Sequence, residues 1–364
     1  MKVAIITLHR VFNYGSVLQT YATQKIFEKA GFDAEIIDYI PLSWQTGNLL
    51  RNAEKKSSAV KTCIYRFFRF FSILLKELTF WGFLKRNIRM TRKYRSIAEL
   101  KNDPPDADVY CTGSDQVWNK KYCGIDKAFY LRFGDASIPK IAYSASFGAT
   151  ELEDGEKDVV KEYLNDYRLI SVREDSAVKI LEDMGMDGQV LIDPTLQISA
   201  AEWREIAAPK MIKRPYLLLM LLYNEDNNAT SIARRIANEK NLELVKLSWD
   251  MIKPKTVDRL MTHRTPREFL SLFRNADYVV TNSFHGLAFS INFNRQFTVI
   301  KRNEFNSRIE SLLRLTGLCE RLTDMDVDMK IVNKKIDYTQ VNGILESERE
   351  KAADFLQAIK GIGV

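Results

Sequence analysis

The segment Lys2-Val3-Ala4-Ile5-Ile6-Thr7-Leu8 decides the fold class of this chain. A near-continuous apolar run of this length is typical of a strand that is buried on both faces of a parallel sheet. A helical pattern over 16–29 and a second apolar strand over 34–39 follow it. A strand, a helix and a strand in this order predict a βαβ unit, and therefore an α/β layered fold.

The same alternation continues along the chain, with a break at Asp193-Pro194-Thr195. Before the break, strands are predicted at 108–111, 140–144, 169–172 and 189–192, and a helix at 175–184. After a polar connector at 199–213, strands are predicted at 216–223, 243–247, 278–281 and 297–300, and helices at 227–240, 266–274, 284–292, 305–316 and 346–360. We therefore expect two α/β domains, over 1–195 and 196–345, and a C-terminal helix within 346–364. In such folds the ligand lies beyond the carboxyl ends of the strands, here in the cleft between the domains.

Composition places the chain among ordinary globular proteins. It has 364 residues, 46% hydrophobic and 28% charged, with 16 Gly and 9 Pro, which excludes a disordered, collagen-like or low-complexity protein. Four widely spaced cysteines argue against a disulfide framework or a cysteine zinc site, and three histidines argue against a multi-histidine metal centre. We expect no metal and no bound cofactor. The first residues do not match a signal peptide and no apolar run reaches the length of a membrane span, so we expect a cytoplasmic protein.

A basic and aromatic helical insertion is predicted at about 51–101. It holds 14 Lys and Arg against three Glu, a net charge of +11, whereas the rest of the chain carries −4. Six apolar residues in it follow helical spacing: Phe67, Phe70, Phe71, Leu74, Leu75 and Leu78. Three interpretations stay open: a helix that packs on the body of the protein, a basic amphipathic helix on an anionic membrane surface, and a nucleic-acid-binding helix. No nucleic-acid-binding motif accompanies the charge, so we expect no nucleic-acid partner.

Polar and small residues gather where predicted strands end, which is where binding loops form in such folds. The first group follows the first strand and comprises Asn13, Tyr14, Gly15, Ser16 and Gln19. Gly15 would let backbone amides approach a ligand at a helix N-terminus, and Asn13 and Gln19 carry groups suited to sugar hydroxyls. The second group follows the strand at 108–111 and comprises Gly113, Ser114, Asp115 and Gln116. For both groups the alternative is a plain turn with a helix cap.

Arg173 comes where the strand at 169–172 ends, so its guanidinium is expected to point into the cleft. There its planar fork would suit bidentate capture of a carboxylate or phosphate. The alternative is a structural ion pair with Glu174 or Asp175.

His285 is the second candidate, in the first turn of a predicted helix within Asn282-Ser283-Phe284-His285-Gly286. A histidine in a cleft suits proton transfer near neutral pH, although a lone histidine is also often a hydrogen-bonded core residue. Gly286 would allow close approach of a ligand. Downstream, Arg302 and Arg308 offer further donors to an anion, or are simply exposed.

Taken together, these segments resemble the polysaccharide pyruvyl transferase family. In chain order the matching motifs are Asn13-Tyr14-Gly15 with Val17-Leu18-Gln19, then 113–119, 171–174, 193–195 and 282–287. The resemblance implies a GT-B-like fold of two Rossmann-type domains with parallel sheets facing a cleft. It also implies transfer of pyruvate from phosphoenolpyruvate to two hydroxyls of one sugar, which gives a cyclic ketal and phosphate.

The resemblance places the donor on the second domain and the acceptor on the first, with Arg173 and His285 as the catalytic residues. The implied donor-binding residues are Arg173, Asn282, Ser283, His285, Gly286 and Arg308. The implied acceptor-binding residues are Asn13, Tyr14, Gly15, Gln19, Gly113, Ser114, Asp115 and Gln116. Acceptor sugars of this family are commonly carried on polyprenyl diphosphate at the inner face of the bacterial membrane, which favours the membrane interpretation of 51–101. Two rivals stay open: a GT-B glycosyltransferase that uses a nucleotide-sugar, and a non-catalytic carbohydrate-binding scaffold.

Overall fold

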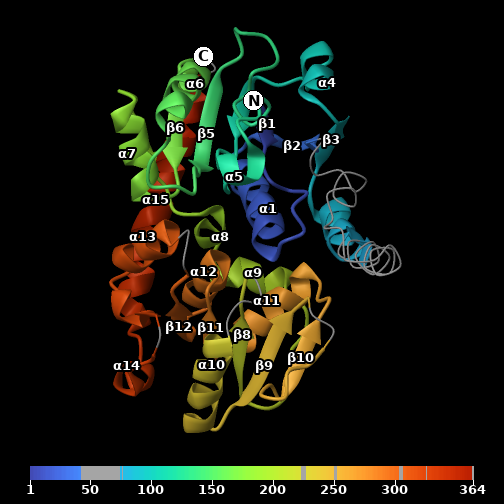
Figure 1. The fold of residues 1–364 in the computed structure, drawn as a ribbon. Coiled ribbons are helices and arrows are strands. Elements are labelled where there is room, and N and C mark those ends of the chain that lie inside the picture. Colours follow the sequence, from blue (N-terminus) through green and yellow to red (C-terminus); the bar gives the residue numbers. More distant parts are fainter. Residues whose placement is uncertain are drawn as a thin grey trace, which may run out of the picture.

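Two parallel β-sheets, one in each half of the chain, form the framework of the described protein (Figure 1). The computed structural model describes residues 1–41, 74–75, 77–222, 227–249, 252–302, 306–324 and 326–362. The strand orders are β3-β2-β1-β4-β5-β6-β7 and β10-β9-β8-β11-β12-β13. In each sheet the first strand lies between the second and the fourth. The chain adds the first three strands towards one edge, then crosses back and adds the remaining strands towards the other edge. This is the Rossmann order, and both predicted domains therefore have the expected α/β architecture.

The first sheet is built from short strands, of which β1, β4 and β5 are buried almost throughout. The strands are β1 (Lys2–Ile6), β2 (Asp33–Tyr39), β3 (Met90–Tyr94), β4 (Val109–Thr112), β5 (Lys140–Ala145), β6 (Tyr167–Val172) and β7 (Gln189–Val190). Helices α1 (Tyr14–Lys29), α4 (Ile97–Asn102), α5 (Lys120–Cys123), α6 (Asp154–Leu164) and α7 (Asp175–Asp183) connect them. Burial on both faces explains why these strands are apolar runs and not alternating patterns.

The second sheet repeats this plan. Its strands are β8 (Tyr216–Met220), β9 (Glu243–Ser248), β10 (Arg259–Thr262), β11 (Tyr278–Thr281), β12 (Gln296–Ile300) and β13 (Leu322–Thr323). The accompanying helices are α10 (Asn227–Glu239), α11 (Pro266–Asn275), α12 (Phe284–Asn292), α13 (Ser307–Leu315) and α14 (Met329–Asn333). Strand β11 pairs in parallel with β8 on one side and β12 on the other. Helix α12 follows β11 directly, so it starts at the carboxyl end of a central strand.

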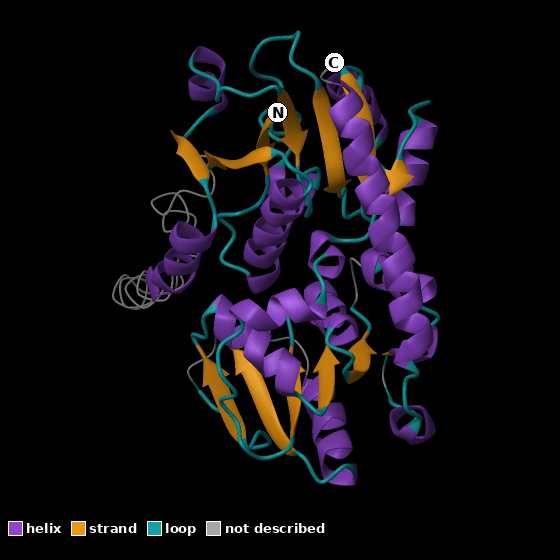
Figure 2. Cartoon of the chain, turned by 180° about the vertical axis from the view of Figure 1, so that it is seen from behind, coloured by secondary structure: helices purple, strands orange, loops and turns teal. Residues whose placement is uncertain are grey.

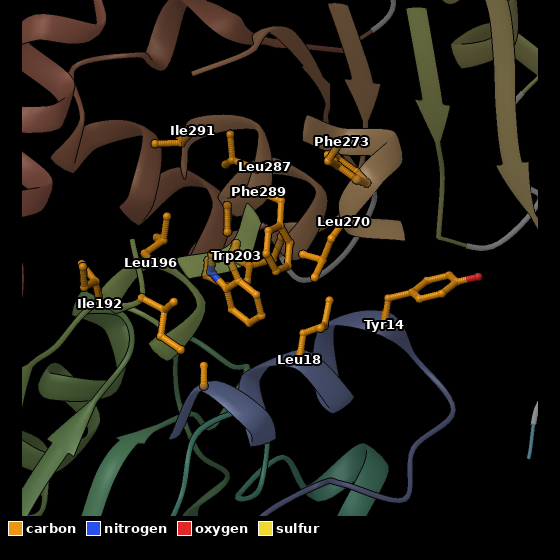
Figure 3. Close-up of a cluster of buried hydrophobic side chains, with 14 of the residues drawn as sticks. Tyr14, Leu18, Ile192, Leu196, Trp203, Leu270, Phe273, Leu287, Phe289 and Ile291 are labelled. Carbon is orange, nitrogen blue, oxygen red and sulfur yellow. The ribbon is translucent and has the colours of Figure 1, made fainter. Parts of the chain in front are cut away.

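A layer of helices lies between the two sheets (Figure 2). The chain between the two sheets contributes α8 (Pro194–Gln197) and α9 (Ala200–Ile206), which lie beside α1, α11 and α12. Apolar side chains from all five helices form one buried cluster, and Figure 3 shows α1 facing α11 and α12 across it. Tyr14 stacks on Phe269 with ring centroids 4.6 Å apart, and its hydroxyl donates to the Arg264 carbonyl at 2.7 Å. The interface between the domains is therefore a continuous hydrophobic core.

Helix α15 (Tyr338–Ile362) joins the two domains along one side of the molecule (Figure 1). At its start the Tyr338 hydroxyl donates to the Arg295 carbonyl, beside β12. Towards its end the Phe355 ring lies 5.9 Å from the ring of Tyr143 in β5. The helix predicted over 346–360 thus begins at Tyr338, within the second domain.

The predicted insertion at 51–101 needs correction, because its last third belongs to the first sheet. Met90–Tyr94 forms β3, the parallel edge strand beside β2, and Ile97–Asn102 forms α4. A helix over 77–87 precedes them and buries Phe80, Phe83 and Leu84 in the interdomain core. That part therefore packs on the body of the protein. Leu75 and Leu78 are exposed, at 39% and 63%, and the predicted face at Phe67, Phe70 and Phe71 lies outside the described residues.

Candidate active site

A cavity of about 340 Å³ opens between the domains at the point where both sheets reverse their strand order. Ligands of doubly wound α/β folds bind at this position, beyond the carboxyl ends of the strands. Loops that follow β1, β4, β8 and β11 line the cavity, together with α13. The lining includes Leu8, Arg10, Phe12, Asn13, Ser16, Asp115, Gln116, Leu222, Asn282, Ser283, Phe284, His285, Arg302 and Arg308.

Two helix N-termini converge on this cavity, one from each domain. Asn13 caps α1 by accepting from the Gly15 N–H at 2.9 Å, and Ser283 caps α12 by accepting from the Gly286 N–H at 3.3 Å. Asn282 is held by the Leu222 N–H, which donates to its Oδ1 at 2.6 Å. The first turns of the two helices carry partial positive charge, which favours an anionic ligand between them.

His285 lies in the first turn of α12, and its ring packs against the first turn of α1. A Cβ atom built on Gly15 would lie 2.0 Å from Nδ1 of His285, so the absence of a side chain there gives the ring its place. Nε2 lies 3.6 Å from Oδ2 of Asp193. The His285 ring, which belongs to the second domain, thus lies between Gly15 and Asp193, which both precede residue 196.

Asp193 contacts the site residues Arg173 and His285, although its sequence context did not single it out as part of the site. Its Oδ1 accepts from the Thr195 N–H at 2.9 Å and the Thr195 hydroxyl at 2.6 Å. Its Oδ2 accepts from Nη1 of Arg173 at 2.6 Å. Burial disfavours the carboxylate, but His285, Arg173 and Thr195 stabilise its charge more, so the pKa of Asp193 lies well below its usual range. The available signal was the Asp-Pro-Thr break in the alternation.

Arg173 reaches the site but is enclosed by carboxylates. Besides Asp193, its guanidinium lies 3.5 Å from Oδ1 of Asp115 and 3.9 Å from Oε2 of Glu174. It lines a second cavity of about 310 Å³, which shares Phe284 and Arg308 with the first cavity. Of the two ion pairs left open from the sequence, the one with Glu174 is present, whereas the shortest contact of Arg173 is with Asp193, which was not among them.

Arg308 is the cation that faces both cavities. Its side chain is buried, with Cζ 5.6 Å from the centroid of the Phe284 ring, and its Nε has no hydrogen-bond partner within the described residues. With its amide oxygen turned toward Arg308, Gln116 accepts from both Nη atoms at 3.1 and 3.3 Å. Burial and the charge of Arg173 lower the pKa of Arg308 to about 10. Such a desolvated cation with an unused donor is suited to bind an anion.

Arg10 supplies a further charge that the sequence reasoning missed. It lines the cavity, and Asp38 holds it in place. Oδ1 of Asp38 also lies 3.0 Å from Nε2 of His9. Nε of Arg10 donates to Asp38 at 2.8 Å, and its guanidinium stacks over Trp81 at 4.0 Å. Because these partners lie far apart in the sequence, no local motif marks them.

Seven of the predicted binding residues do not line this cavity: Tyr14, Gly15, Gln19, Gly113, Ser114, Arg173 and Gly286. Tyr14 joins the domains, and Gln19 is fully buried where its amide donates to the Thr7 hydroxyl at 2.9 Å. Gly113 donates to the Ile6 carbonyl at 2.8 Å. A Cβ at Gly286 would lie 2.3 Å from Oγ1 of Thr281, so this glycine lets α12 pack on its own strand. These residues build the scaffold of the site.

The order of these motifs along both domains matches a known family. A family model described as polysaccharide pyruvyl transferase matches residues 13–304. This chain belongs to the polysaccharide pyruvyl transferase family. In this family member the match runs from α1 to β12, so it leaves out β1 and β13. It contains Asn13, Arg173, Asp193 and His285, but it ends before Arg308. The family is one of transferases, and it implies a polysaccharide acceptor.

Solved structures show the same two-domain arrangement. UDP-N-acetylglucosamine 2-epimerase from Rickettsia bellii is 9% identical, with a TM-score of 0.51 over 98% of this chain and 97% of that one. Arabidopsis thaliana UGT89C1 complexed with UDP-L-rhamnose is 9% identical, with a TM-score of 0.50 over 98% of both chains. Glycosyltransferase SsfS6 from Streptomyces sp. SF2575, complexed with thymidine diphosphate, is 12% identical, with a TM-score of 0.48 over 99% of both chains. The two structures with TM-scores of 0.51 and 0.50 show that the fold of this transferase is GT-B-like. No curated protein matches the chain significantly.

Among the described residues, no helix is long and apolar enough to cross a bilayer. Within the same residues, no group of three or more His, Cys, Asp and Glu side chains is arranged to hold a metal ion.

Proposed function

We propose that this protein transfers pyruvate from phosphoenolpyruvate to two hydroxyls of a sugar in a bacterial surface polysaccharide or its precursor. The observation that carries the proposal is the cavity between the two helix N-termini, with Arg308 and His285 on its wall. Phosphoenolpyruvate carries a carboxylate and a phosphate on three carbons. Its site therefore needs several groups that donate hydrogen bonds to anions within a small space. The family supports pyruvyl transfer, and the donor molecule is part of our proposal.

The electrostatics of the cavity suit such a donor. Arg302 and Arg308 line it, and the first turns of α1 and α12 add partial positive charge. Arg173 is neutralised by its carboxylate neighbours, so we assign direct donor binding chiefly to Arg308. Arg173 keeps Asp115 and Asp193 in place, which prevents these carboxylates from repelling the donor.

The proposed chemistry requires a proton at the methylene carbon of phosphoenolpyruvate. Protonation there creates an oxocarbenium-like centre at the neighbouring carbon, which one sugar hydroxyl attacks. The second hydroxyl then displaces phosphate and closes the ketal. His285 is the cavity-lining group suited to give or take a proton in these steps, which typically contributes about 10²–10⁴-fold to the rate.

The acceptor would enter from the side of the first domain, past Asn13, Asp115 and Gln116. We propose that it is lipid-linked and that the basic segment at 51–101 holds the protein against the inner face of the membrane. The support is the charge of that segment, together with the exposure of Leu75, Leu78, Lys85 and Arg86.

The test is thermal unfolding with phosphoenolpyruvate, UDP, UDP-sugars and GDP-sugars, followed by phosphorus NMR of any phosphate released. A ligand at a hundred times its Kd stabilises the folded state by about 2.7 kcal/mol. We expect a shift with phosphoenolpyruvate that is clearly smaller in Arg308→Met. It should persist in the matched control Arg314→Met, whose side chain is 66% exposed and pairs with Asp175.

The rivals predict different results. A shift with nucleotide-sugars alone would replace the proposal by a glycosyltransferase. Binding of a polysaccharide without release of phosphate from phosphoenolpyruvate would indicate a carbohydrate-binding scaffold.

A further inference from the structure

His285 is carried by the second domain, but two groups of the preceding part of the chain decide how its ring is presented. We propose that Asp193 and Gly15 are positioning residues that direct Nδ1 of His285, and not Nε2, toward the ligand in the cavity. The chemical use of that nitrogen rests on the proposed function, whereas its orientation can be tested in the resting protein.

The first argument concerns Nε2. This atom is buried, has no hydrogen-bond partner within the described residues, and lies 3.6 Å from Oδ2 of Asp193. The Asp193 carboxylate cannot turn away, because Thr195 holds one oxygen and Arg173 holds the other. A fixed carboxylate beside one ring nitrogen favours a proton on that nitrogen and leaves the lone pair on the other. A ligand in the cavity therefore meets Nδ1.

The second argument concerns Gly15. A Cβ there would lie 2.0, 2.3 and 2.6 Å from Nδ1, Cγ and Cε1 of His285. Distances this similar place the added atom over the flat face of the ring, next to Nδ1. The φ of Gly15 is not positive, so the backbone itself does not require glycine. Glycine within a helix costs about 0.5–1 kcal/mol relative to alanine. The space for the imidazole explains why α1 carries glycine at its second residue.

The third argument concerns charge around the ring. Asp193 approaches it from the segment before α8, and Asp115 and Arg308 line the same cavity as the ring. Arg173, at the end of β6, is paired with Asp193. Of these groups, the Asp193 carboxylate lies beside Nε2, at 3.6 Å, which favours a proton on that nitrogen.

The direct test is nitrogen-15 NMR of the histidine rings at pH 8. The chain has three histidines, so the spectra of the wild type and His285→Asn identify the resonances of His285. We expect the Nε2–H tautomer in the wild type and a mixture of tautomers in Asp193→Asn. Asp258→Asn, which removes a carboxylate paired with Arg234 at 2.8 Å, is the control and should leave the His285 spectrum unchanged. An Nδ1–H tautomer in the wild type would overturn the proposal even if Asp193→Asn failed to fold.

The kinetic test compares two glycine variants. Gly15→Ala should lower kcat by about 100-fold, because a misplaced catalytic group costs about that much, with a small change in KM for phosphoenolpyruvate. Gly343→Ala, in the second turn of α15 with no atom near the added carbon, should leave turnover unchanged. Equal kcat in Gly15→Ala and the wild type would remove Gly15 from the proposal.

The two proposals fail separately. If the tautomer result holds but phosphoenolpyruvate is not turned over, the proposed function is wrong and the positioning is right. If turnover occurs with the opposite tautomer, the positioning is wrong.

Discussion

Nη1 of Arg173 lies 2.6 Å from Oδ2 of Asp193, and solvent reaches neither side chain. A buried ion pair of this kind contributes little over an apolar pair, but breaking it leaves an uncompensated charge in the interior. Arg173 also faces Asp115 and Glu174, so one guanidinium compensates three carboxylates. Its first task is therefore to hold the site together, and this separates it from Arg308.

Replacing Arg173 should destabilise the fold, and this loss of stability should be measurable apart from any effect on catalysis. Arg173→Met keeps the side-chain volume but leaves the three carboxylates unpaired. We expect a loss of about 3–5 kcal/mol in the free energy of unfolding. Urea unfolding followed by circular dichroism measures it, with Arg314→Met as the control for an exposed pair. A loss below about 1 kcal/mol, the range of exposed pairs, would show that Arg173 is not needed for the carboxylate cluster.

Glu174 should behave in the opposite way to Asp193. Burial raises the pKa of Glu174, so the folded protein takes up a proton there that the unfolded chain releases above about pH 4.5. The stability contributed at this site therefore falls as pH rises from about 4.5 towards the raised pKa of Glu174 in the folded protein. Relative to the wild type, Glu174→Gln should be more stable at pH 7.5 than at pH 4.5. Urea unfolding at the two pH values tests the sign, and a pH-independent difference would contradict it.

Arg308 should matter for binding more than for stability. Hydrogen bonds to charged groups contribute about 1.5–3 kcal/mol, so Arg308→Met should raise the Kd of phosphoenolpyruvate about 10- to 100-fold. Burial and the charge of Arg173 lower the pKa of Arg308, so its charge opposes folding and we expect its removal to cost little stability. Isothermal titration calorimetry gives the Kd and differential scanning calorimetry gives the Tm. Unchanged affinity would place the donor elsewhere.

Gly286 should be intolerant of a methyl group for a reason unrelated to the ligand. Its Cβ would lie 2.3 Å from Oγ1 and 3.0 Å from Cβ of Thr281, whose hydroxyl accepts from the Ser283 N–H. We expect Gly286→Ala to cost about 1–3 kcal/mol, as overpacking of a core does. Gly343→Ala, with no atom near the added carbon, should instead stabilise α15 by about 0.4–1 kcal/mol. Chemical denaturation of both variants decides the question.

Charge reversal of Lys85 and Arg86 should weaken binding to membranes. Both residues are exposed on the helix over 77–87. Each basic residue near an anionic surface contributes about 1 kcal/mol, so Lys85→Glu with Arg86→Glu should reduce sedimentation with phosphatidylglycerol vesicles at least about tenfold. The control pair Lys330→Glu and Lys335→Glu lies exposed in the second domain. Equal binding by both pairs would leave this part of the segment with a packing role alone.

The central strands and the edge strand β7 were predictable from sequence, whereas the edge strands β3, β10 and β13 were not. Strands such as β1 and β11 are apolar runs because both faces are buried. The edge strand β3 reads Met-Thr-Arg-Lys-Tyr and is half exposed, so its charges resemble those of the basic segment before it. Likewise, edge strand β10 has no buried residue and was not predicted. An edge strand carries polar residues on its open side, which removes the signal that identifies a central strand.

The site divides in the same way. Asn282, Ser283 and His285 were found because one strand and one helix place them next to each other in the sequence. The pairing of Asp193 with Arg173 and His285 depends on how two domains meet, and no local pattern encodes it. Residue type alone also assigned Gly15 and Gly286 to ligand contact, whereas both make room for other parts of the protein.

Helix α15 imposes an order of assembly on the newly made chain. About 150 residues separate the end of β7 from Tyr338, and synthesis at about 5–20 residues per second takes on the order of 10–30 s to cover them. During that interval the apolar surface beside Tyr143, which Phe355 later covers, is open to water. The first sheet is therefore translated first, but its surface beside Tyr143 is covered only when α15 is made. Chaperones can bind this surface during that interval. We expect a chain truncated before Tyr338 to leave the surface exposed and to aggregate.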